Sequence, residues 1–97
     1  MATLLSAQTS NTTGTGATLT GPCTVWVTGE FDGAQVEIQV AQEDVSGDYA
    51  RPSVDKPEYG VFYEKGNISI NAVGAYYIRA LLRNAGALTS VTVETAQ

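Results

Sequence analysis

The stretch 23–40 reads CTVWVTGEFDGAQVEIQV and decides the fold class. Apolar and polar residues alternate over 23–28 and again over 34–40, and an Asp-Gly pair at 32–33 lies between the two runs. Alternation is typical of a strand with one face on a core, and Asp-Gly is a strong turn signal. We therefore predict two strands joined as an antiparallel hairpin. Their core-facing residues would be Cys23, Val25, Val27, Val36, Ile38 and Val40.

Further short strands are expected in the second half of the chain. Residues 61–63, 67–71 and 87–94 are rich in β-branched or aromatic residues and are separated by turn residues. The segment 75–83, AYYIRALLR, fits a strand or a helix, and we favour a strand because nine residues are short for a helix. Tyr76, Ile78, Ala80 and Leu82 would then face inward, opposite Tyr77, Arg79, Leu81 and Arg83.

Residues 4–5 and 17–20 could each add a short strand. Seven or eight short antiparallel strands at this spacing predict a single all-β domain, a small β-sandwich or a jelly-roll-like barrel. We place this sandwich domain at 17–97. Residues 1–16 are rich in Ser, Thr, Gly and Ala, so we expect a flexible N-terminal arm or an extended segment held by its neighbours. Residues 42–60 hold two of the three prolines and no lasting period, which predicts a long loop.

The charge balance disfavours several classes of partner. The chain has 97 residues, 5 basic and 10 acidic, for a net charge of -5. Its cations are scattered along the sequence, whereas nucleic-acid binding and anionic membranes both favour a basic patch. No apolar run approaches the roughly 18 residues of a membrane span, and no basic leader is seen. We expect synthesis in the cytoplasm and contact with neither nucleic acid nor membrane.

Catalytic chemistry finds little support in the composition. The chain has no His and a single cysteine, Cys23, expected to be a small core residue, so His-based acid–base chemistry and an internal disulfide are excluded. The acids at 30, 32, 43, 44 and 48 form the only conceivable catalytic or calcium-binding set, and their spacing fits solvated loop acids better than an EF-hand. We expect no enzyme activity, no metal and no cofactor.

Aromatic and Arg residues indicate a surface for binding. Adjacent positions of a strand face opposite ways, so one of Tyr76 and Tyr77 must lie outside the core. Tyr and Arg are enriched at protein interfaces. Packing on the sheet and an aromatic platform for a sugar are the alternatives for these side chains. The candidate interface residues are Tyr49, Arg51, Tyr59, Tyr77, Arg79 and Arg83.

Four segments together resemble a known group of proteins: GTGA at 14–17, VWVTGEFDGAQV at 25–36, GAYYIRA at 74–80 and LTSVTV at 88–93. They resemble the small β-sandwich virion proteins of tailed bacteriophages, which include head decoration (cement) proteins and fibre or tail accessory modules. The resemblance covers most of residues 14–95 and lies in the style of the strands and turns. No site residue of these proteins is assigned to this chain on the basis of the resemblance.

The resemblance implies a non-enzymatic structural role at the capsid surface of a virion. The partners would be the major capsid protein and further copies of this chain, with a homotrimer favoured. The protein would be made in the host cytoplasm and would strengthen the assembled shell. The alternatives are a fibre or tail accessory module, a carbohydrate-binding sandwich on the virion, and a head–tail joining or tail component.

Overall fold

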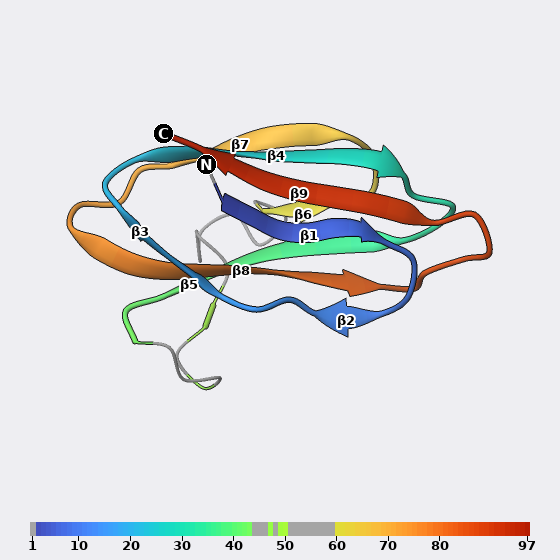
Figure 1. Ribbon diagram of the computed structural model, residues 1–97, viewed down its shortest axis with the longest axis horizontal. Coiled ribbons are helices and arrows are strands. Elements are labelled where there is room, and N and C mark those ends of the chain that lie inside the picture. The colour runs from blue at the N-terminus through green and yellow to red at the C-terminus, as the bar shows by residue number, and fades with distance from the viewer. Residues whose placement is uncertain (1, 44–46, 48, 51–59) are drawn as a thin grey trace.

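The computed structural model describes residues 2–43, 47, 49–50 and 60–97, which form strands joined by turns (Figure 1). None of these described residues lies in a helix that is long and apolar enough to cross a membrane. The strands are β1 (Ala2–Gln8), β2 (Thr12–Thr13), β3 (Ala17–Thr20), β4 (Cys23–Glu30), β5 (Gln35–Ala41), β6 (Val61–Phe62), β7 (Gly66–Ile70), β8 (Ala75–Arg83) and β9 (Ser90–Ala96).

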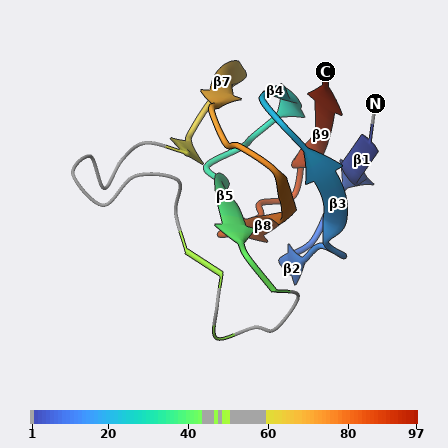
Figure 2. The same cartoon turned by 90° about the vertical axis from the view of Figure 1, so that its left-hand side faces the viewer.

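Two antiparallel sheets pack face to face (Figure 2). Sheet A has the strand order β1-β9-β4-β7, and sheet B has the order β2-β8-β5-β6. Strand β3 also pairs with β8, along the half of β8 that β2 leaves open. Strands β2 and β3 therefore act as one interrupted edge strand of sheet B.

The connectivity is that of a jelly roll. With β2 and β3 counted as one strand, each step along the chain changes sheet, except the step from β5 to β6. Eight strands wound in this way form the two four-stranded sheets of a jelly roll. The predicted all-β sandwich or jelly-roll-like fold is confirmed.

The predicted hairpin between 23–28 and 34–40 is wrong. Strand β4 lies in sheet A between β9 and β7, whereas β5 lies in sheet B between β8 and β6. The predicted inner faces are correct, because Val25, Val27, Val36 and Ile38 are all fully buried. Alternation specifies which face of a strand is buried, but it does not specify the partner strand.

The link from β4 to β5 crosses between the sheets at the end of the core. Phe31 is buried there, and its carbonyl oxygen accepts a hydrogen bond from the amide of Ala34 at 2.9 Å. The same oxygen accepts the hydroxyl of Thr89 at 2.7 Å, and the Asp32 carboxylate accepts the amide of Leu88 at 2.9 Å. These bonds attach the crossing to the turn between β8 and β9, so the Asp-Gly signal marks a link between sheets.

The N-terminal residues are not a flexible arm but an extended segment held by its neighbours, the second of the two predicted alternatives. Residues 2–8 form β1, which pairs along β9, and both Leu4 and Leu5 lie in the core. The pairing register shifts between Thr3 and Leu5, and such a bulge lets two consecutive side chains face the same way. Composition alone suggested an arm because this irregularity hides the alternation that marks a strand.

The segment 75–83 is a strand, as predicted, and it lies at the centre of sheet B. Its inner face carries Tyr76, Ile78, Ala80 and Leu82, all in the core cluster. Leu81 points outward but is only 7% exposed. The outer face of sheet B is therefore partly covered.

Candidate functional site

The outer face of sheet B brings together the described members of the predicted interface. The register of β5 and β8 places Gln39 opposite Arg79, Ala41 opposite Tyr77 and Gln35 opposite Arg83. Tyr77, Arg79 and Arg83 therefore share one face, as the strand pattern predicted. Arg51 and Tyr59 lie outside the described residues, as does most of the predicted loop at 42–60.

A polar network runs across this face and joins β5, β8 and the segment after β5. The Nε of Arg79 donates to Gln39 Oε1 at 2.9 Å, and the amide of Gln39 donates to the carboxylate of Glu37. Arg83 Nη1 lies 3.9 Å from Glu37 Oε1. Tyr49 completes the network, because the guanidinium of Arg79 stacks on its ring at 4.0 Å from the centroid.

Tyr49 reaches this face because the chain returns to the sheet just after it. Val40 and Ala50 exchange two backbone hydrogen bonds, of 2.8 and 3.0 Å. This bridge holds Ala50, and with it the neighbouring Tyr49, against β5. The stacking then restricts the rotation of the long Arg79 side chain.

Glu37 is the electrostatic centre of the network. It is only 4% exposed although it points away from the core. A buried carboxylate is costly unless hydrogen bonds or an opposite charge compensate it, and Gln39 and Arg83 supply both. The side chain of Arg83 is still 52% exposed, so part of its guanidinium is open to a partner.

Sequence reasoning missed Glu37 and Gln39 as members of the site. Their alternation with Val36 and Ile38 marked them only as solvent-facing residues. The signal that could have found them is an acid on β5 beside the two Arg of β8. That signal becomes visible only once β5 is known to pair with β8.

The outer face of sheet A has a different character. Its strands contain Glu30 and Glu94 but no Lys or Arg, whereas the strands of sheet B contain one acid and two Arg. Trp26 lies near the middle of this face and is 48% exposed. The two outer faces of the sandwich thus differ in charge and in how far their polar groups are already paired.

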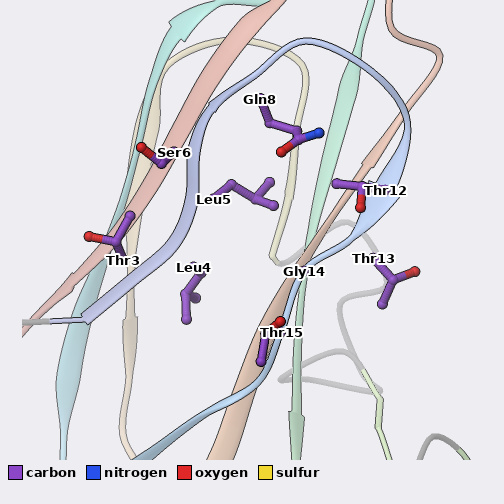
Figure 3. A pocket seen from close by; sticks show the side chains of 9 residues that line it. All are labelled: Thr3, Leu4, Leu5, Ser6, Gln8, Thr12, Thr13, Gly14 and Thr15. Carbon is purple, nitrogen blue, oxygen red and sulfur yellow. The ribbon is translucent and has the colours of Figure 1, made fainter.

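A hollow of about 370 Å³ opens between β1 and β2 (Figure 3). Its lining consists of backbone, aliphatic carbon, Ser and Thr hydroxyls and one Gln amide, with no titratable side chain. A second hollow, of about 520 Å³, lies near the C-terminus and includes Cys23 and Gln97 in its lining. Neither hollow brings two carboxylates together as a hydrolytic site requires.

Cys23 is buried, as predicted, and contacts Tyr76. The Tyr76 hydroxyl lies 2.8 Å from the carbonyl oxygen of Gly21 and 3.2 Å from the sulfur of Cys23. Burial, together with the neighbouring thiol, raises the pKa of Tyr76 above its ordinary range. The buried side chains of Cys23 and Tyr76 thus pack together at one end of the core.

The described candidate acids, Glu30, Asp32 and Glu43, are all exposed. Asp32 accepts a backbone hydrogen bond in its turn, and Glu43 is exposed. Asp44 and Asp48 lie outside the described residues. Within the described part of the chain, no three His, Cys, Asp or Glu side chains are grouped so that they could hold a metal ion.

No family model, curated protein or solved structure matches this chain. One fold supports many functions, so a functional argument depends on its surfaces.

Proposed function

We propose that this protein is a non-enzymatic virion structural protein of a tailed bacteriophage, a head decoration protein that stabilises an assembled capsid. The observation that carries the proposal is the outer face of sheet B, where Tyr77, Arg79 and Arg83 share one face, Tyr49 stacks on Arg79, and Arg83 lies beside the buried Glu37. The jelly-roll fold is compatible with it, since viral capsid domains use this architecture, as do lectins and cupins.

The face is suited to a protein partner because much of it is ordered in advance. Gln39 and Tyr49 already hold Arg79, so binding loses less side-chain entropy than it would with a free Arg. Arg83 remains half-exposed and can pair with a carboxylate or a carbonyl group of the partner. A capsid surface with acceptor groups is the complement of this face.

Assembly in many copies would make a modest interface sufficient. Each copy would contribute a small binding free energy, and a homotrimer would hold three such faces at once. A domain of 97 residues also has a small core, so contacts between copies would add to its stability. The proposed partners are the major capsid protein and further copies of this chain.

The first test is the native mass in solution by light scattering. A trimer of three 10.2 kDa chains supports a decoration protein, whereas a larger ring would favour a head–tail joining or tail component. A monomer would contradict the homotrimer in solution. It would also favour the fibre or glycan-binding alternative.

The second test is co-sedimentation with capsids of the same phage that lack the protein. We expect the wild-type protein to sediment with them and the double variant Arg79→Ala/Arg83→Ala to lose most of this binding. Lys65→Ala, which removes an exposed cation from the turn before β7, is the matched control. Tyr77→Ala tests the same face without touching the Glu37 network.

Two results would contradict the proposal. Wild-type protein that stays in the supernatant would exclude a decoration role for this chain. Full binding by both face variants, with circular dichroism showing that they are folded, would move the capsid contact away from sheet B.

A further inference from the structure

The outer face of sheet A carries a row of side chains that crosses all four strands. In the pairing register, Thr3 on β1 lies opposite Glu94 on β9, Glu94 opposite Trp26 on β4, and Trp26 opposite Asn67 on β7. Three strand spacings make this Trp26 row about 14 Å long. Figure 2 shows no described segment lying over the outer side of these strands.

The side chains of the Trp26 row lie on the solvent side of sheet A. Trp26 is 48% exposed, Thr3 and Asn67 are exposed, and Glu94 is half-buried. Among the described residues, none of the side chains of Trp26, Asn67 and Glu94 has a hydrogen-bond or ion-pair partner. On sheet B, by contrast, Arg79, Gln39 and Glu37 already bind one another.

We propose that the Trp26 row is a binding platform for a neutral, linear oligosaccharide. A pyranose ring would stack its C–H face on the indole of Trp26. Its hydroxyl groups would donate to the Glu94 carboxylate and accept from the Asn67 amide. Bonds from both neighbouring strands would fix the ring over Trp26, and Thr3 would extend the platform to the edge at β1.

The charge of the face selects a neutral glycan. The four strands carry the carboxylates of Glu30 and Glu94 and no cation, and the whole chain has a net charge of -5. A sulfated or uronic polymer would meet like charge on this face, whereas a neutral sugar offers the hydroxyl donors that a carboxylate needs.

The composition of the face favours a saccharide over a protein. The centre of a protein interface normally gathers several aromatic or aliphatic anchors. Here Trp26 is the one large apolar side chain of the row, and its neighbours on β4 are Thr24 and Thr28. A single aromatic ring surrounded by hydrogen-bonding side chains is complementary to a sugar, which presents an apolar C–H face and hydroxyl groups around its ring.

Tryptophan fluorescence provides a direct test, because Trp26 is the only Trp of the chain. The full chain would be titrated with cellohexaose, chitohexaose and maltohexaose, and with a hyaluronan hexasaccharide as the anionic probe. We expect at least one neutral hexaose to shift the emission to shorter wavelength and to protect Trp26 from acrylamide quenching. The anionic probe should do neither.

Variants then assign the binding to the row, with affinity measured by calorimetry. We expect Trp26→Ala to weaken binding about tenfold or more, as removal of an aromatic anchor commonly does. Asn67→Ala and Glu94→Gln should weaken it less. Tyr63→Ala is the matched control, since Tyr63 is 67% exposed but lies outside sheet A.

Any of three results would overturn the platform. The first is that no neutral hexaose protects Trp26 from acrylamide quenching at millimolar concentration. The second is an affinity for the hyaluronan probe equal to that for the neutral hexaose, and the third is an unchanged hexaose affinity in folded Trp26→Ala. If that variant does not fold, unchanged affinity in both Asn67→Ala and Glu94→Gln is the overturning result. The test uses no capsid, so its outcome is independent of the decoration proposal.

Discussion

Replacing Leu4 or Leu5 by alanine tests whether β1 is an integral strand of the sandwich. Both side chains lie in the core and are 5% and 4% exposed, respectively. Leu→Ala removes about three methylene-sized groups, whose transfer from water contributes about 2.4 kcal/mol. The cavity left behind adds to this loss, so we expect each variant to lose about 2–4 kcal/mol of unfolding free energy.

Urea unfolding followed by circular dichroism measures this loss, and thermal unfolding gives an independent value. A loss of about 2–4 kcal/mol corresponds to a fall of roughly 10–20 °C in Tm for a domain of this size. Ser6→Ala is the control on the same strand, because Ser6 is exposed, and it should change the stability by less than about 0.5 kcal/mol. If both leucine variants unfold at the wild-type midpoint with an unchanged slope, β1 does not belong to the core and the arm hypothesis is correct.

Three further comparisons test other parts of the structure. Gly29 has φ +116 and lies against the backbone at the start of β9, whereas Gly33 has φ +82 and open space around it. Gly29→Ala should therefore lose about 2 kcal/mol more unfolding free energy than Gly33→Ala in urea unfolding. Equal losses would contradict this packing. The raised pKa of Tyr76 means that the folded state keeps a proton which the unfolded chain releases near its ordinary pKa of about 10. Stability should therefore be complete below about pH 10 and fall as the pH rises above it, and Tyr76→Phe should flatten that fall in alkaline unfolding curves. Glu37→Ala should cost about 1–3 kcal/mol of unfolding free energy, because it leaves the side-chain amide of Gln39 without its acceptor. Arg83→Ala should also cost about 1–3 kcal/mol, because it removes the opposite charge from a carboxylate that is only 4% exposed. Unchanged urea unfolding in both variants would count against a structural role for Glu37.

The inner faces of the strands could be predicted from the sequence because burial imposes a period of two. Val25, Val27, Val36 and Ile38 were correctly assigned to the core for this reason. Strand pairing could not be predicted in the same way. The alternation of β4 is satisfied equally by a hairpin with β5 and by its actual position between β9 and β7.

The candidate site was predictable only in part. The register of β8 placed Tyr77, Arg79 and Arg83 on one face, which needs no knowledge of the partner strand. The contribution of Glu37 depends on the β5–β8 pairing, which local sequence does not determine.

The pairing of the first strand with the last has a consequence during synthesis. The hydrogen bond between the Ala2 amide and the Thr95 hydroxyl joins residues that are 93 positions apart. While the ribosome is still translating the chain, Leu4 and Leu5 have no partner strand, and sheet A lacks β9 from its centre. Such distant pairing makes folding slow and leaves an unpaired edge exposed in the meantime. The nascent chain is therefore open to aggregation, or to capture by a chaperone, until β9 has left the exit tunnel.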